Sequence, residues 1–247
     1  MHRFFLPADW ISQSTAVITG KIIHQLRDVL RLGIGDHITI LDNSGWQYEV
    51  ELMEVGAGKI EGAVISKNLA AGEPRTSITL YQALLKGSNF EVVLQKCTEI
   101  GVTDFVPMLC ERCVAGEPTS NRISRWKTII LEAAEQSRRG RLPGLHDVIQ
   151  FNDARRLASG IVLLPWEGER LRDIGDVLKS HSKAEKPQKV SILIGPEGGF
   201  SSQEVEFALN CGTVPVSLGP RILRAETAGL VAAAITLYEF GDLDNKT

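Results

Sequence analysis

The sequence predicts two structural parts, a small β-rich module followed by an α/β domain built on a parallel sheet. Polar and apolar residues alternate over residues 37–65, as in strands with one buried face. After a linker at residues 70–74, short apolar runs alternate with helical patterns, which is typical of a parallel sheet covered by helices. Two apolar runs near the end of the chain each stop at a Gly-Pro dipeptide. We therefore expect a first domain over residues 1–70 and a second over residues 75–247.

The composition limits the classes of protein to which the chain can belong. Its 247 residues are enough for a full core, its net charge of -3 gives no overall sign of a nucleic-acid partner, and no apolar run is long enough to span a membrane. The motif Cys110-x-x-Cys113 lacks further ligands at zinc spacing. We therefore favour free thiols in a reducing cytoplasm over a metal or redox site, and we expect no bound metal and no membrane segment.

The first module contains one helix and one hairpin. Residues 21–32 have the pattern of an amphipathic helix. Its exposed face carries four basic or titratable side chains, namely Lys21, His24, Arg27 and Arg31. A solvated helix face and a phosphate-contacting edge explain them equally well, because residues 1–75 contain fewer basic than acidic residues. The strands at residues 37–41 and 46–52, joined by the turn Asn43-Ser-Gly45, form a hairpin.

The second domain alternates between strands and helices. Apolar runs predict five strands, at residues 77–84, 104–109, 161–164, 191–194 and 214–217. Helical spacing predicts five helices, at residues 88–101, 121–139, 169–180, 201–210 and 227–240. Ser88-x-x-Glu91 and Ser201-x-x-Glu204 each have the form of a capping box at the start of a helix. A polar loop is expected over residues 183–189.

Two loops near the end of the chain offer the groups of a binding site. One strand ends in Gly195-Pro-Glu-Gly-Gly199 and the next leads into Gly219-Pro-Arg-Ile-Leu-Arg224. The loops and the helix after them carry three charged side chains of interest, Glu197, Arg224 and Glu226. Taken singly, each residue is equally consistent with a tight turn, a helix-dipole contact or a salt bridge. Two such loops at successive strand ends favour a shared site.

Other motifs narrow the chemistry. The sequence has no P-loop, no Gly-x-Gly-x-x-Gly after a strand and no Gly-x-Ser-x-Gly elbow, so any cofactor is held by a different arrangement. Arg138-Arg-Gly-Arg141 closes the most positive stretch of the chain. Cationic side chains at the end of a helix are favourable for dipole reasons alone, yet this cluster is also a candidate for binding phosphate.

Several motifs together resemble one family. Ile194-Gly-Pro-Glu-Gly-Gly-Phe-Ser201 and Leu218-Gly-Pro-Arg-Ile-Leu-Arg-Ala-Glu-Thr-Ala228 are similar to the signature of the SPOUT (α/β-knot) RNA methyltransferases, and specifically of the RsmE family. The resemblance extends to Lys86–Glu91 and Glu132–Arg138 and covers nearly the whole chain. One departure is Cys113, which stands where the family pattern leads us to expect serine.

The resemblance implies a fold and a function. It implies a PUA-like, RNA-binding β-barrel ahead of a SPOUT-type parallel sheet with a deep trefoil knot, working as a cytoplasmic homodimer. The implied reaction is methyl transfer from S-adenosylmethionine to N3 of a uridine, at position 1498 of the 16S rRNA in the small ribosomal subunit. A methyltransferase of the same fold that acts on another RNA such as tRNA, and a non-catalytic RNA-binding protein, remain alternatives.

The resemblance also implies roles for individual residues. The expected contacts to the cofactor are Leu164, Gly195, Pro196, Glu197, Gly198, Leu218, Gly219, Ile222, Leu223 and Thr227. Arg224 is expected to bind the negative charge that develops on the base, or the target phosphate. Glu197 or Glu226 accepts the N3 proton or orients Arg224, and the residues leave both assignments open. The expected contacts to RNA are Arg3, His24, Arg27, Arg31, Arg138 and Arg139.

Overall fold

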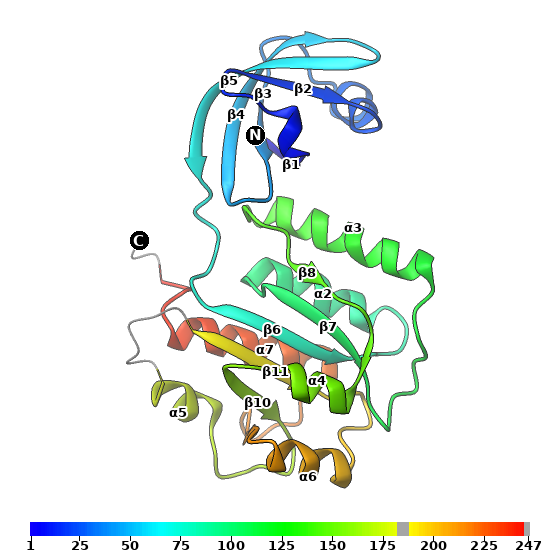
Figure 1. The fold of residues 1–247 in the computed structure, drawn as a ribbon, viewed down its shortest axis with the longest axis vertical. Helices are drawn as coiled ribbons and strands as arrows, with labels where there is room; N and C mark the ends of the chain where they lie inside the picture. The colour runs from blue at the N-terminus through cyan, green and yellow to red at the C-terminus, as the bar shows by residue number, and fades with distance from the viewer. Residues whose placement is uncertain (182–187, 245–247) are drawn as a thin grey trace. The chain divides into compact units, whose positions relative to one another are not determined.

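The structure is a computed structural model that describes residues 1–181 and 188–244, and the chain divides into two compact units. The first unit comprises Met1–Glu73 and Ala134–Leu142, and the second comprises Pro74–Ala133 and Pro143–Thr247 (Figure 1). The first unit is therefore built from two separate stretches of the chain.

The first unit is a five-stranded curled sheet around an apolar core. Its strands are β1 (His2–Phe5), β2 (Thr15–Thr19), β3 (His37–Leu41), β4 (Trp46–Val55) and β5 (Lys59–Leu69), in the order β1-β3-β4-β5-β2 (Figure 1). β1 and β3 are parallel and the other pairs are antiparallel, which confirms the expected β3–β4 hairpin. The β4–β5 pairing shifts register twice, and such bulges bend strands and increase their twist.

The helix expected over residues 21–32 is shorter than expected and changes its type of winding. α1 covers Ile22–His24 and continues as a π-helical turn over Gln25–Val29, in which the N–H of Leu30 donates to the carbonyl of Gln25 at 2.9 Å. Arg31 then adopts a left-handed backbone conformation with φ of 56°. π-helical turns are rare in proteins, and many of those that occur lie at functional sites.

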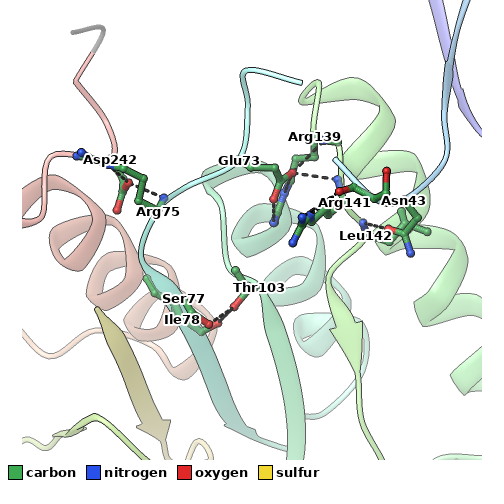
Figure 2. A network of polar contacts seen from close by, with 12 residues as sticks. Asn43, Glu73, Arg75, Ser77, Ile78, Thr103, Arg139, Arg141, Leu142 and Asp242 are labelled. Atoms are coloured by element: carbon green, nitrogen blue, oxygen red, sulfur yellow. Dashed lines mark hydrogen bonds and ion pairs between the residues drawn. The ribbon is translucent and has the colours of Figure 1, made fainter. Parts of the chain in front are cut away.

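Residues 134–142 join the first unit through polar contacts to its linker. The Glu73 carboxylate accepts four hydrogen bonds, from Arg139 Nε at 3.2 Å, Arg139 Nη2 at 3.0 Å, Gly140 N at 2.9 Å and Arg141 N at 3.1 Å (Figure 2). Arg141 Nη2 donates to the Ser44 carbonyl at 2.9 Å. The Arg139 side chain is only 2% exposed, so its charge lies inside the unit, and the Glu73 carboxylate neutralises it there.

The second unit contains a parallel sheet. Its strands are β6 (Ser77–Ala83), β7 (Asp104–Leu109), β8 (Gly144–Leu145), β10 (Ile161–Pro165), β11 (Lys189–Ile194) and β12 (Val214–Val216), in the order β12-β10-β11-β6-β7-β8, with β9 (Ile149–Gln150) beside β7. All pairs are parallel, and the five expected strands are confirmed. β8 and β9 were not expected, because two residues are too few to show a period. Most of the expected polar loop at residues 183–189 lies outside the described residues.

Helices cover both faces of this sheet. They are α2 (Asn89–Ile100), α3 (Ser120–Gln136), α4 (Phe151–Leu157), α5 (Ile174–Lys179), α6 (Ser202–Asn210) and α7 (Ala225–Glu239). One face packs Ile78 and Leu80 against α2, α3, α5 and α7, and the other packs Tyr81 and Ala83 against α4 and α6. Among the described residues, no helix combines the length and the hydropathy that crossing a membrane requires.

Several helices differ from expectation, and local hydrogen bonds explain the later start of α5. α5 begins later than residue 169 because the Glu169 carboxylate accepts backbone N–H groups from Leu171 and Arg172, and Asp173 then caps the helix by accepting from Gly175 N at 2.8 Å. α3 ends at Gln136 rather than at residue 139. α4 was not expected at all, and α7 begins two residues earlier than expected.

The two expected capping boxes have different outcomes. Ser201 Oγ accepts from Glu204 N at 3.3 Å, and Glu204 Oε2 accepts from Ser201 N at 2.8 Å, which confirms the box at α6. Ser88 occupies the N-cap position of α2, yet its side chain makes no capping hydrogen bond, so that box was wrong.

Candidate functional site

Three loops meet at one edge of the parallel sheet. β10, β11 and β12 are neighbours in the sheet and run in the same direction, so their carboxyl ends lie together. The loops that follow them contain most of the residues expected to bind a cofactor. Crevices at the carboxyl ends of parallel strands are the usual ligand sites of open α/β sheets. Leu164 lies one residue before the end of β10 and is fully buried.

The loop after β11 is a tight turn that hydrogen bonds from two other segments of the chain hold in place. Gly199 N donates to the Pro196 carbonyl at 2.9 Å, and the φ of 69° at Gly199 is a left-handed value that favours glycine. The Glu197 carboxylate accepts the backbone N–H of Lys86 at 2.9 Å. Arg112 Nη1 donates to the Gly198 carbonyl at 3.1 Å. Glu197 therefore anchors this loop to the loop after β6.

The loop after β12 is held by the segment that precedes α5. Ser217 N donates to the Arg172 carbonyl at 2.8 Å, and Ser217 Oγ accepts from Gly219 N at 3.2 Å. Gly219 has a φ of 104°, which side chains disfavour. The loop then presents Ile222 with 90% of its surface exposed, while Leu223 and Leu218 are half-buried. A fully exposed isoleucine next to half-buried leucines is a surface suited to an apolar contact.

Arg224 and Glu226 form a charged pair at the start of α7. Arg224 occupies the N-cap position, and its carbonyl accepts from Thr227 N at 2.9 Å. The Arg224 guanidinium is 86% exposed and lies 3.9 Å from a Glu226 oxygen. Arg224 thus pairs with Glu226, while Glu197 accepts the backbone N–H of Lys86. The Arg224 guanidinium is therefore open to an anionic group from solvent.

A buried polar residue that sequence reasoning missed lies beneath this edge. Gln82 is fully buried on β6, opposite Ile194 of β11, and its Oε1 has no hydrogen-bond partner among the described residues. Gly229 of α7 makes room for it, because a Cβ at that position would lie 3.0 Å from Gln82 Oε1. The sequence does contain a signal for this residue, because Gln82 is a polar residue within the apolar run at residues 77–84. Buried polar atoms without partners are rare and call for a specific explanation.

Comparisons with known proteins agree with this geometry. A family model described as "RNA methyltransferase domain" matches residues 72–237. "Ribosomal RNA small subunit methyltransferase E" of Bacillus subtilis is 32% identical over 97% of this chain and 97% of its own length, and the protein of that name from Synechocystis sp. is 35% identical over 94% of this chain and 76% of its own. The chain belongs to the RsmE family of RNA methyltransferases.

A solved RsmE structure extends the comparison to the fold. The crystal structure of "Ribosomal RNA small subunit methyltransferase E" from Neisseria gonorrhoeae, bound to S-adenosyl methionine, is 30% identical, has a TM-score of 0.83 and covers 95% of each chain. The mixed α/β architecture of this chain, with its parallel sheet and curled five-stranded sheet, is therefore that of an RsmE protein.

The residues expected to contact RNA in this RsmE protein lie in different settings. His24 Nδ1 and the Arg27 guanidinium both bind the Asp28 carboxylate, which holds the pKa of Asp28 at about 2, first through the hydrogen bond from Arg27. Arg3 Nη2 donates to Gln47 at 2.8 Å, and burial together with the charge of Arg138 lowers the pKa of Arg3. The proximity of Arg3 and Arg138 makes a local positive patch in the first unit.

Arg139 corrects the sequence-based expectation of a contact to RNA. Its guanidinium is buried and paired with Glu73, so it has no exposed face for a phosphate. Arg31 is exposed and lies two residues beyond the π-helical turn. We therefore retain five of the six expected residues as candidates, namely Arg3, His24, Arg27, Arg31 and Arg138.

A cavity formed by the described residues lies away from the three loops. It has a volume of about 480 Å³, within the range of small-molecule sites. Ser77, Asp104 and Lys189, at the amino ends of β6, β7 and β11, lie on its wall. It therefore opens at the opposite edge of the sheet from the three loops. In the described part of the chain no group of three or more His, Cys, Asp or Glu side chains could hold a metal ion.

Proposed function

We propose that this chain transfers a methyl group from S-adenosylmethionine to N3 of a uridine in the 16S rRNA of the small ribosomal subunit. The observation that carries the proposal is the meeting of the loops after β10, β11 and β12 at one sheet edge, with Arg224 beside it. Family membership, the names of the relatives and the bound S-adenosyl methionine of the Neisseria protein support it. The family resemblance points to position 1498 and to a cytoplasmic enzyme.

The loop residues fit S-adenosylmethionine. We assign the contacts to Leu164, Gly195, Pro196, Glu197, Gly198, Leu218, Gly219, Ile222, Leu223 and Thr227. Glycines at 195, 198 and 219 leave backbone groups open to the ligand, and a Cβ at Gly198 would already lie 3.3 Å from Arg112. Leu218 and Leu223 offer half-buried apolar surface. When bound, S-adenosylmethionine supplies a methyl group made electrophilic by its sulfonium.

The charged pair fits the chemistry that uracil requires. N3 of uracil is a weak acid, so a base must take its proton, and negative charge then spreads onto O2 and O4. The exposed Arg224 guanidinium can bind that charge, or the phosphate of the target nucleotide. Glu226 is the carboxylate next to it and can accept the proton or orient Arg224. We assign Glu197 the role of a loop anchor because of its hydrogen bond to Lys86 N.

We further propose that the first unit is a PUA-like barrel that positions the RNA. Arg3 and Arg138 form one positive patch, and His24, Arg27 and Arg31 lie on and beside the π-helical turn. Phosphate contacts of this kind fix register without reading sequence. The target base must leave its stack to expose N3, which costs least in single-stranded or loosely paired RNA.

We also propose that the second unit contains a deep trefoil knot and works as a homodimer. The strand order is not sequential, and α7 packs against both α2 and α5, which supports a last segment threaded between earlier elements. α7 carries apolar residues all round, and Tyr238 on it is 65% exposed. A helix that is apolar on every side belongs in a buried position. A monomeric mass by light scattering at micromolar concentration would contradict the dimer.

The test is transfer of labelled methyl to small ribosomal subunits that lack the modification. We expect N3-methyluridine in the digested 16S rRNA. Arg224→Ala is expected to lower the rate about 100-fold or more, as the loss of a charge-stabilising group does. Arg221→Ala, an exposed arginine of the same loop, is the matched control and should stay within about threefold of the unchanged protein.

Other outcomes of the same test select the alternatives. Label in tRNA and none in 16S rRNA would keep the fold and replace the substrate. A chain that binds no S-adenosylmethionine in a titration would be a non-catalytic RNA-binding protein. Equal loss of rate in the Arg221 and Arg224 variants would remove the specific role of Arg224.

Glu197 can be tested separately. Glu197→Ala is expected to weaken binding of S-adenosylmethionine about tenfold, because the loop loses a charge-assisted hydrogen bond to Lys86 N. Glu197→Gln keeps an acceptor oxygen and should bind within about threefold and still transfer methyl. Calorimetric titration measures the affinity for S-adenosylmethionine, and single-turnover kinetics measure the rate of methyl transfer. Retained binding with lost transfer in Glu197→Gln would make Glu197 the proton acceptor instead of the anchor.

A further inference from the structure

Cys110 and Cys113 form the two ends of a tight turn just after β7. Cys113 N donates to the Cys110 carbonyl at 3.0 Å, which closes the turn, and Cys110 N donates to Cys113 Sγ at 3.3 Å. The ends of such a turn have Cα atoms less than about 7 Å apart, and disulfides need about 4.4–6.8 Å. The sequence analysis favoured inert free thiols, but the turn brings this pair within bridging distance.

The two sulfurs have opposite character. The hydrogen bond from the Cys110 thiol, helped by the Cys110 N–H, lowers the pKa of Cys113 to about 7, against the effects of burial and of the Glu204 charge. The same hydrogen bond and burial raise the pKa of Cys110. Cys113 is half-buried, whereas Cys110 is buried. Cys113 is thus the nucleophile, because the thiolate is the reactive form and a pKa near the ambient pH is the optimum for exchange.

The turn also touches the proposed cofactor loop. Arg112, between the two cysteines, donates from Nη1 to the Gly198 carbonyl at 3.1 Å. Its neighbour Glu111 donates from its backbone N to Glu204 Oε1 at 2.8 Å, and Glu204 is the residue that completes the capping box of α6. A change in the backbone of the turn therefore reaches the loop at Gly198 and the first turn of α6 that follows it.

We propose that Cys110 and Cys113 form a thiol–disulfide exchange site that links the redox state of the cell to the loop carrying Gly198. The co-reactant is a low-molecular-weight disulfide such as glutathione disulfide. The effect on the loop rests on the proposed function, since it is read out through S-adenosylmethionine, while the exchange itself does not.

The chemistry takes two displacements. The Cys113 thiolate attacks one sulfur of the small disulfide, its S–S bond breaks, and one small thiolate leaves. The hydrogen bond that raised the pKa of Cys110 is then lost, so the Cys110 thiol gives its proton to water more readily. The Cys110 thiolate attacks Cys113 Sγ and releases the second small thiolate. Two protein thiols are oxidised to one disulfide, and one small disulfide is reduced to two thiols.

The other two cysteines serve as internal controls. Cys97 is buried on α2, and burial raises its pKa, so it should not react. Cys211 is exposed and has no second cysteine in the same turn. It can form a mixed disulfide but cannot close one within a loop.

The test uses the reduced full chain, glutathione disulfide at pH 7 and mass spectrometry of the intact protein and its peptides. We expect a Cys110–Cys113 link with the loss of two hydrogens. In Cys110→Ser, a stable glutathione adduct should remain on Cys113 and form about three times faster than on an ordinary exposed thiol. Cys113→Ser should form neither product. Modification confined to Cys211, or an adduct on Cys113 in the unchanged chain that never resolves, would overturn the exchange site.

A second measurement tests the link to the cofactor loop. Titration of S-adenosylmethionine should show at least about threefold weaker binding to the oxidised chain, a loss of order 0.6 kcal/mol, with full recovery after dithiothreitol. Cys113→Ser treated in the same way should not change. Equal affinity of the oxidised and reduced chains would overturn the link and leave the exchange site standing. Absence of binding in both forms would overturn the link together with the proposed cofactor, again without touching the mass-spectrometric result.

Discussion

Gly160→Ala is expected to destabilise the second unit by about 4 kcal/mol. Gly160 precedes β10 and has a φ of 73°, a left-handed value that costs alanine about 1–2 kcal/mol. A Cβ there would lie 2.1 Å from the Lys189 carbonyl oxygen, so β10 and β11 would have to separate where Ile161 pairs with Val190. Urea denaturation should show a lower midpoint at an unchanged slope.

Gly212→Ala is the matched control. Gly212 also lies in the second unit and has a φ of 80°, but a Cβ would meet nothing within 4 Å. The control should lose only the conformational cost of about 1–2 kcal/mol. If both variants lost the same amount, steric contact with Lys189 would not be the cause, and the close approach of β10 and β11 would be unimportant for stability.

Arg139→Ala is expected to destabilise the first unit by about 3 kcal/mol, because it leaves the Glu73 carboxylate without its counter-charge. Glu73→Gln should cost at least as much: its amide oxygen can still accept from Gly140 N and Arg141 N, but the Arg139 charge, which is the more buried of the two, loses its counter-charge. The free energy of unfolding, followed by near-ultraviolet circular dichroism in urea, measures both effects.

Arg138→Ala is the comparison for this pair. Arg138 is the neighbouring arginine and is exposed, so its removal should change stability by less than about 1 kcal/mol. For the affinity for RNA, measured under conditions in which both variants are folded, we expect the reverse order. Arg138→Ala should bind RNA more weakly than the unchanged chain, and Arg139→Ala should not. An Arg139 variant as stable as the Arg138 variant would show that the pair with Glu73 contributes little.

The sequence predicted those features whose causes are local. The capping box at Ser201 closes over four residues, and both of its hydrogen bonds are present. The five long strands of the parallel sheet follow from apolar runs. The meeting of the loops at Gly195 and Gly219 follows from parallel strands, whose carboxyl ends share an edge.

Features with distant causes could not be predicted. Glu73 and Arg139 are 66 residues apart, and Glu197 and the Lys86 amide are 111 residues apart. No periodicity or motif links such positions, so Arg139 looked like a surface charge and Glu197 like a free carboxylate. The π-helical turn at Gln25–Val29 was also hidden, because its apolar spacing resembles that of an α-helix.

The return of residues 134–142 to the first unit has a consequence for gene architecture. A domain encoded as one uninterrupted stretch can be lost, exchanged or fused by a single recombination event. Here deletion of residues 1–73 would remove Glu73 and most of the unit to which residues 134–142 belong, and Arg139 would lose its ion pair. A single cut at residue 74 therefore leaves residues 134–142 behind without their unit, and exchanging the first unit between genes takes changes at two separate places in the reading frame.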